Sequence, residues 1–234
     1  MKPGLVLLPG LLCDGALWGP QVGALSGIAE WWIPESLAQA SMPAMAHAVL
    51  RDAPFERFAL AGLSMGGYVC MEIMRQAPQR VSAVALLDTR ATADTPEETQ
   101  RRHDLMRLAQ TARGFQPVTT RMLPLLIHSS RLGDLALVEV VRGMAQRTGI
   151  EAFVRQQQAI ISRPDSRADL KRIAVPSLVL CGRQDALTTL SDHEDMARLI
   201  PGAKLIVIEE CGHLSSLERP DEVNAALRGW IAQL

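Results

Sequence analysis

Short hydrophobic runs recur along the chain, and most are bounded by glycine, proline or a charged residue. They predict five strands and a weaker one near the start of the chain: Leu5–Leu8, Trp31–Ile33, Phe58–Leu63, Val81–Leu87, Ser177–Leu180 and Lys204–Ile208. The runs are apolar nearly throughout instead of alternating with polar residues. Strands that are covered on both faces of a parallel sheet have this pattern.

Apolar residues at helical spacing fill the intervals between these runs. They predict helices at Trp18–Leu25, Met42–Arg51, Met65–Gln76, Ser191–Leu199 and Pro220–Ala232. This alternation of strand and helix predicts an α/β fold with a doubly wound, mostly parallel sheet of about six strands. Because such sheets bind ligands beyond the carboxyl ends of their strands, the loops that leave each strand are the places to look for chemistry.

One long interval, from about Asp94 to Leu170, interrupts the alternation and shows helical runs without a clear strand. These runs are Glu97–Ala112, Gln116–Ile127, Leu135–Arg147 and Ile150–Ile161. We therefore expect a helical cap, residues 94–168, inserted into a core made of residues 1–93 and 169–234. Since the insertion leaves after one strand and returns before the next, its helices should lie over the carboxyl edge of the sheet.

The charged residues nearly balance and form no block of one sign, with 25 acidic and 24 basic residues among 234. This balance argues against a nucleic-acid partner and against an anionic membrane surface. An aromatic content of 4% also leaves no row of rings on which bases could stack. We expect a small-molecule substrate and a protein that is a monomer or a homodimer.

The four cysteines, Cys13, Cys70, Cys181 and Cys211, are scattered and show no CxxC spacing, which predicts reduced thiols. Prolines and glycines between residues 3 and 10 interrupt the apolar start of the chain before a membrane segment could form. The sequence therefore predicts a cytoplasmic protein.

The sharpest chemical motif is Gly62-Leu63-Ser64-Met65-Gly66, which follows a predicted strand and opens a predicted helix. A serine at such a tight strand-to-helix turn has an exposed hydroxyl and a strained backbone, and the flanking glycines relieve the crowding. Ser64 is therefore the candidate nucleophile.

A serine hydroxyl needs a general base, and His213 is the best of five histidines because it lies just past the last predicted strand. His128 and His193 are the alternatives, although the polar segment around His193 suggests the exposed start of a helix. The base in turn needs an acid. Asp185, which follows the strand Ser177–Leu180, is the candidate, and Asp88 at the end of another strand is its rival.

The oxyanion of an acyl-transfer reaction requires two backbone N–H donors. Met65 supplies one because it follows the nucleophile, and Leu11, in the loop after the first strand, is placed to supply the other. The chain contains no HExxH motif, no cysteine cluster and no phosphate-binding loop. We therefore expect neither a metal nor a cofactor.

Together, Leu7-Leu8-Pro9-Gly10, the Ser64 motif, Gly182–Asp185 and Gly212-His213 resemble the α/β-hydrolase superfamily, in particular its small esterase and lactonase-like branch. The resemblance implies an acyl-enzyme mechanism on an ester of a small or medium-sized molecule. A lactone, a thioester or a carbon–carbon bond are alternative targets of the same residues, and a weakly catalytic ligand receptor is a further alternative. The cap contributes Met106, Met122, Leu123, Leu125, Leu126, Ile127 and Met144, which suggests either an apolar acyl pocket or the packing of the cap helices.

Overall fold

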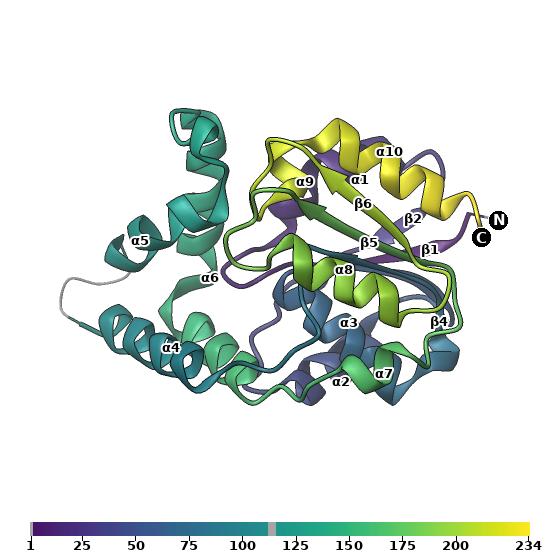
Figure 1. Ribbon diagram of the computed structural model, residues 1–234, viewed down its shortest axis with the longest axis horizontal. Helices are drawn as coiled ribbons and strands as arrows, with labels where there is room; N and C mark the ends of the chain where they lie inside the picture. The colour runs from purple at the N-terminus through teal and green to yellow at the C-terminus, as the bar shows by residue number, and fades with distance from the viewer. Residues whose placement is uncertain (1, 112–115) are drawn as a thin grey trace.

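The computed structural model describes the fold of residues 2–111 and 116–234 (Figure 1). Its centre is a six-stranded sheet with the order β2-β1-β3-β4-β5-β6, in which all neighbours are parallel. The strands are β1 (Gly4–Leu8), β2 (Glu30–Trp32), β3 (Phe58–Leu63), β4 (Val81–Leu87), β5 (Ser177–Gly182) and β6 (Lys204–Ile208). The predicted doubly wound sheet is confirmed. The weak strand near residue 31 begins one residue earlier than the pattern indicated.

Helices cover both faces of the sheet, and this explains the continuous apolar runs. Alternate residues of β1 belong to two hydrophobic clusters: Leu5 and Leu7 pack on one side of the sheet, and Val6 and Leu8 on the other. The first side is covered by α1 (Gly19–Leu25) and α10 (Pro220–Ile231), and the second by α2 (Met42–Asp52), α3 (Met65–Gln76) and α8 (Leu190–Leu199). The short helices α7 (Arg167–Leu170) and α9 (Ser215–Glu218) complete the two layers.

Between β4 and β5 the described residues form helices and no strand: α4 (Pro96–Ala109), α5 (Gln116–Leu126) and α6 (Leu135–Ile161), followed by the short α7. Thr95 and Glu98 form a capping box that starts α4. Of the predicted helix Glu97–Ala112, the last residue lies outside the described residues. The two runs predicted at 135–147 and 150–161 form α6, whose helical geometry breaks at Gly149 with φ 76°.

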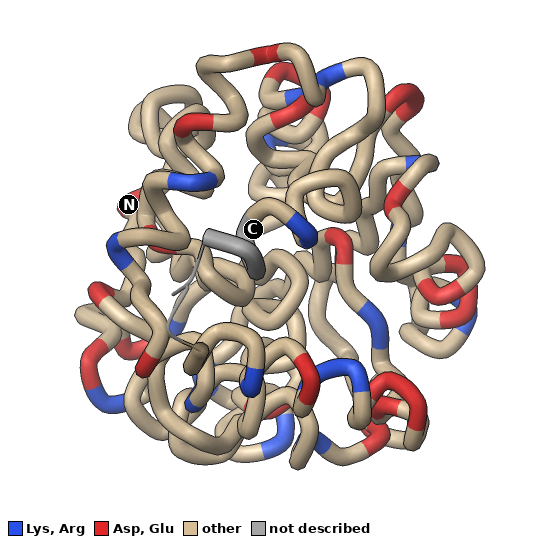
Figure 2. The backbone as a smooth tube through the Cα atoms, turned by 90° about the vertical axis from the view of Figure 1, so that its left-hand side faces the viewer, with Lys and Arg blue, Asp and Glu red and all other residues tan. Residues whose placement is uncertain are grey.

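Helices α4 to α6 lie beside the carboxyl ends of the strands, at the end of the molecule opposite the two termini (Figure 1). Viewed from that end, acidic and basic residues are interspersed along the backbone, without a large region of one sign (Figure 2). Among the described residues, no helix combines the length and the apolar character that crossing a bilayer requires.

Candidate active site

Ser64 occupies the tight turn between β3 and α3, with a backbone geometry that side-chain-bearing residues rarely adopt (φ 57°, ψ −117°). The turn needs glycines on both sides. A Cβ at Gly62 would overlap the carbonyl group of Gly66, and a Cβ at Gly66 would overlap the carbonyl group of Leu8. The N–H of Ser64 donates to the carbonyl of Leu87 at 2.9 Å, which ties the turn to β4. This packing fixes the hydroxyl at the carboxyl edge of the sheet.

The three side chains singled out in the sequence meet in one hydrogen-bonded chain. The Ser64 Oγ lies 2.8 Å from His213 Nε2, and His213 Nδ1 lies 2.7 Å from Asp185 Oδ2. His213 is 2% exposed and Asp185 6% exposed, so the contact between them is shielded from water. This is the order hydroxyl, imidazole, carboxylate that activates a serine.

Close backbone contact brings the loops of Asp185 and His213 together. A Cβ at Gly182 would overlap the carbonyl group of Gly212, so only a glycine at 182 permits this approach. The N–H of Gln184 donates to the carbonyl of Cys211 at 3.0 Å, and the N–H of Cys211 donates to the Gln184 side chain at 3.1 Å. These contacts connect the loop after β5 to the loop after β6.

The Asp185 carboxylate is held by donors from its own loop. Its Oδ1 accepts the N–H groups of Leu187 at 2.8 Å and Thr188 at 3.0 Å, and its Oδ2 accepts the Thr188 hydroxyl at 2.6 Å. Burial opposes the negative charge, but the positive charge of His213 and these hydrogen bonds hold the pKa of Asp185 below its usual range. Burial alone would lower the pKa of His213, and the nearby Asp185 charge raises it above the ordinary value. The pair is therefore suited to carry a proton on the imidazole.

Asp88, the rival acid, lies close by without contacting the imidazole. Its Oδ1 accepts the N–H of Gly182 at 3.0 Å, and its Oδ2 bonds to the hydroxyl and N–H of Ser215. Complete burial, followed by the charge of Asp185, raises the pKa of Asp88 to about 8. The geometry therefore places Asp185, and not Asp88, on the imidazole, and Asp88 braces the loops on either side.

His193 was expected at an exposed helix start, and that expectation is wrong, because the side chain is completely buried. Its Nε2 accepts the N–H of Thr89 at 2.9 Å, and its Nδ1 lies 2.8 Å from the carbonyl of Thr189. Since the carbonyl can only accept, Nδ1 carries the proton. The Thr89 hydroxyl donates to the carbonyl of Ser64 at 2.8 Å. His193 therefore holds Thr89, and Thr89 in turn holds the backbone of Ser64. The third candidate, His128, bonds to Ser130 through Nδ1 and takes no part in the hydrogen bonds that link Ser64, His213 and Asp185.

The two backbone groups expected to bind an oxyanion belong to the segments that meet at Ser64. Met65 follows Ser64 at the first position of α3, where an N–H has no acceptor within the helix. The loop after β1 passes close by, since a Cβ at Gly10 would be 3.3 Å from the Cβ of Ser64. Leu11 in this loop lines the same cavity as Ser64. Its neighbour Leu12 is held by a hydrogen bond of 3.1 Å to Gln156 of α6, a contact that the sequence gave no reason to expect.

A cavity of about 370 Å³ opens in front of Ser64 and His213. Of the hydrophobic residues expected in a cap pocket, Met122, Leu125 and Leu126 line it. The others are packed against neighbouring helices or the sheet: Met106, Leu123, Ile127 and Met144. Three of the seven residues therefore line the cavity, and the other four serve in packing.

Histidine, cysteine and acidic residues form no cluster that could hold a metal ion within the described part of the chain. All four cysteines are free thiols. Burial raises the pKa of Cys13, which lines the cavity, to about 12, so this thiol stays protonated and is a poor nucleophile.

Comparisons place the chain among hydrolases. A sequence model of the family described as alpha/beta hydrolase fold matches residues 26–220. The chain is 25% identical to a pimeloyl-[acyl-carrier protein] methyl ester esterase from Nitrosomonas europaea, over 94% of this chain and 92% of that protein. It is also 25% identical to a putative carbamate hydrolase, RutD, from Serratia proteamaculans, over 99% of this chain and 91% of that protein.

Two solved structures extend the likeness to three dimensions. A thermophilic esterase from Thermogutta terrifontis has a TM-score of 0.93 at 28% identity, covering 100% of this chain and 90% of that one. An enol-lactonase from Burkholderia xenovorans LB400 has a TM-score of 0.89 at 23% identity, covering 99% of this chain and 92% of that one, and supports the fold.

Proposed function

Since the chain belongs to the α/β-hydrolase family and is one of its hydrolytic enzymes, we propose that it cleaves a carboxylic ester through an acyl-enzyme formed on Ser64. The observation that carries the proposal is the pair of contacts at 2.8 Å and 2.7 Å linking Ser64, His213 and Asp185. These contacts lie at a strained turn beside a cavity large enough for a small or medium-sized ester.

In the first half of the proposed reaction, the Ser64 oxygen attacks the ester carbonyl while His213 Nε2 takes the hydroxyl proton. The negative oxygen that forms is stabilised by the N–H groups of Leu11 and Met65. When the intermediate collapses, the bond to the alcohol breaks and His213 returns its proton to the departing oxygen. Asp185 holds the imidazole in the required tautomer and stabilises its positive charge.

In the second half, water attacks the acyl-enzyme, again giving a proton to His213, and the acid leaves as Ser64 recovers its hydrogen. A lactone would follow the same proton transfers, a thioester would give its proton to the departing sulfur, and a carbon–carbon bond would need the proton delivered to the departing carbon. Comparing hydrolysis of one substrate of each kind decides among them. We also propose that residues 94–168 act as a cap over the site, since Met122, Leu125 and Leu126 line the cavity. The cytoplasmic location and the monomeric or homodimeric state remain predictions from the sequence.

Hydrolysis of p-nitrophenyl esters with short acyl chains tests this proposal. We expect the wild-type protein to release p-nitrophenol and the Ser64→Ala variant to lose about a millionfold in turnover. Ser26→Ala is a matched control, because Ser26 is exposed and does not line the cavity. Its hydroxyl donates to the carbonyl of Gly23, three residues earlier. Undiminished turnover in Ser64→Ala would refute the mechanism.

A further inference from the structure

One end of the cavity in front of Ser64 is cationic. Arg90, in the loop after β4, and Arg101 and Arg102, on α4, line the cavity together with a single carboxylate, Glu98. The remaining lining residues are mostly apolar, including Leu105, Leu126, Ile160 and Leu187. The proposed hydrolytic reaction uses none of these arginines, so the charge calls for another explanation.

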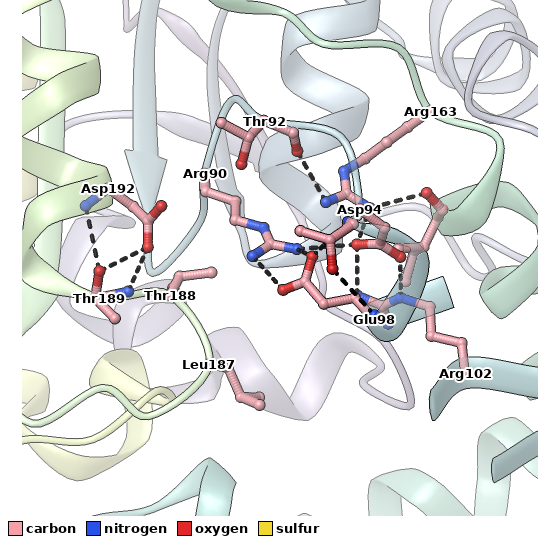
Figure 3. A network of polar contacts seen from close by, with 12 residues as sticks. Arg90, Thr92, Asp94, Glu98, Arg102, Arg163, Leu187, Thr188, Thr189 and Asp192 are labelled. Carbon is pink, nitrogen blue, oxygen red and sulfur yellow. Dashed lines mark hydrogen bonds and ion pairs between the residues drawn. The ribbon is translucent and has the colours of Figure 1, made fainter. Parts of the chain in front are cut away.

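The carboxylates of this region are fully engaged by arginines (Figure 3). Arg90 forms two hydrogen bonds with Glu98, at 2.7 Å and 2.8 Å, and one with Asp94 at 2.9 Å. Asp94 also accepts from Arg102 at 2.5 Å and from Arg163 at 2.8 Å, and its side chain is 1% exposed. Three arginines thus share two carboxylates, and the cluster keeps an excess of positive charge.

Arg101 adds to this excess. It is an exposed residue of α4 that lines the cavity, and among the described residues it forms no ion pair at hydrogen-bonding distance, although the charge of Glu97 one turn earlier interacts with it. A cationic surface in a partly enclosed cavity attracts anions more strongly than the same groups would in open water, because the surroundings screen the charge less.

Gln157 of α6 provides an unused hydrogen-bond donor at the same end. The residue is completely buried, and its Oε1 accepts from Arg102 at 2.9 Å. Because Arg102 can only donate, the atom facing it must be the oxygen, and the amide nitrogen points elsewhere. That nitrogen is buried without a hydrogen-bond partner, as is the Nε of Arg90. Buried donors are normally paired, so these two would gain a partner if a shift of the neighbouring side chains opened them to an acceptor on a ligand in the adjoining cavity.

The cationic end is close to the reacting atoms. Tyr68, one helical turn after Ser64, lines the cavity, and the guanidinium of Arg163 lies 4.3 Å from the centre of its ring. Arg90 directly follows Thr89, whose hydroxyl donates to the carbonyl of Ser64. Because Ser64 and the arginines line one cavity of about 370 Å³, a molecule that reaches both needs to be only of modest length, and most of the other lining residues are apolar.

We propose that the substrate is an ester that also carries a free carboxylate, joined to the scissile ester by a short apolar chain, as in a half-ester of a dicarboxylic acid. The identification of the bond as an ester rests on the proposed function, whereas the carboxylate subsite does not. Planar guanidinium groups and an amide N–H match the two oxygens of a carboxylate. The subsite consists of Arg90, Arg101, Arg102 and Gln157.

Binding to the inactive Ser64→Ala protein tests the subsite without relying on catalysis. Calorimetric titration compares monomethyl adipate, an anion, with dimethyl adipate, its neutral counterpart. We expect the anion to bind at least about tenfold more tightly, the effect of a single charge-assisted hydrogen bond gained. Equal or tighter binding of the diester would overturn the proposal.

Two further substitutions, each combined with Ser64→Ala, test whether the preference for the anion depends on the proposed subsite. Arg101→Gln should reduce the preference for the anion severalfold, and it removes no ion pair between described residues. Gln157→Glu keeps an acceptor for Arg102 but puts a negative charge in the subsite, so it should abolish the preference. Arg107→Gln is the control, because Arg107 is an exposed residue of α4 that pairs with Asp104 and does not line the cavity. An undiminished preference in Arg101→Gln and Gln157→Glu contradicts the subsite.

Turnover by the wild-type protein separates this inference from the proposed function. We expect kcat/KM for mono-p-nitrophenyl adipate to exceed that for p-nitrophenyl hexanoate by about tenfold or more. Preferential binding of the anion without hydrolysis of either ester would refute the proposed function and support the subsite. Faster hydrolysis of the hexanoate, with no preference in binding, would support the proposed function and refute the subsite.

Discussion

The pKa values of the two buried carboxyl groups near His213 are shifted in opposite directions, down for Asp185 and up for Asp88. Asp185 keeps its charge, since His213 and the Thr188 donors offset the effect of burial. Complete burial and the nearby charge of Asp185 raise the pKa of Asp88 to about 8, which leaves this carboxyl mostly protonated at neutral pH. A protonated carboxyl presents one donor and one acceptor, as an asparagine side chain does.

This difference predicts that asparagine has unequal effects at the two positions. Asp185→Asn should lower kcat by about ten-thousandfold, because the imidazole would lose its orienting acceptor and favour the wrong tautomer. Asp88→Asn should cost no more than about tenfold, since the amide oxygen can still accept from Gly182 and the amide NH2 can donate to the Ser215 hydroxyl, and only the Ser215 N–H, which lies 3.3 Å from Oδ2, loses its acceptor. Steady-state kinetics on one activated ester checks both. A larger loss in Asp88→Asn would make Asp88 the working acid.

The pKa of His213 predicts the pH dependence of the reaction. His213 accepts a proton only when it is neutral, and the Asp185 charge raises its pKa above the ordinary value of 6.5 despite burial. The value of kcat/KM should therefore rise with pH through a midpoint above 6.5. In Asp185→Asn the residual activity should have a lower midpoint, because the charge that raises the pKa is gone. An unchanged midpoint would show that another group controls the profile.

The buried His193 should contribute to the stability of the protein. His193→Leu would leave the N–H of Thr89 buried without an acceptor, which should reduce the free energy of unfolding by about 1–3 kcal/mol. Urea denaturation measures this loss. The exposed His47 provides the control, since His47→Leu should change stability by no more than about 0.5 kcal/mol. Equal free energies of unfolding for His193→Leu and His47→Leu would show that His193 has no such stabilising role.

Among the elements, the hydrophobic pattern is sufficient for the central strands β1, β3, β4 and β5, because they are buried on both faces and form nearly unbroken apolar runs. The edge strands β2 and β6 are partly exposed. The same pattern was misleading at the start of α8. Four polar residues around His193 suggest the exposed start of a helix, but His193 and Met196 are spaced three apart and share the buried face of α8, and the buried Ile200 follows directly after the helix. That spacing was the signal that could have identified the buried histidine.

The turn between β3 and α3 makes a prediction about glycine. Gly62→Ala should reduce the free energy of unfolding by about 1–3 kcal/mol or more and impair turnover, because the new methyl group would overlap the backbone of Gly66. Gly23→Ala in α1 is the matched control. Its methyl group would meet nothing within 4 Å, so the better helix propensity of alanine should stabilise the protein by about 0.5–1 kcal/mol. Denaturation of both variants tests the contrast, and a neutral Gly62→Ala would contradict it.

In the molecule as a whole, the three predicted residues Ser64, Asp185 and His213 meet because each follows a strand, and parallel strands end at one edge. Sequence reasoning could not find groups whose roles depend on contacts between distant segments. Gln156 of α6 bonds to Leu12 and Leu37, and Glu218 accepts the N–H groups of His128 and Gly212. The arginines near Asp94 were missed for the same reason, since their side chains meet only after the helices have packed.

The proposed mechanism requires that His213 activates Ser64. Intact-mass analysis after treatment with a fluorophosphonate probe, with the modified peptide located, tests it most directly. We expect a single addition on Ser64, absent in Ser64→Ala and strongly slowed in His213→Ala. Labelling at another residue, or equal labelling of the His213→Ala protein, would contradict the account.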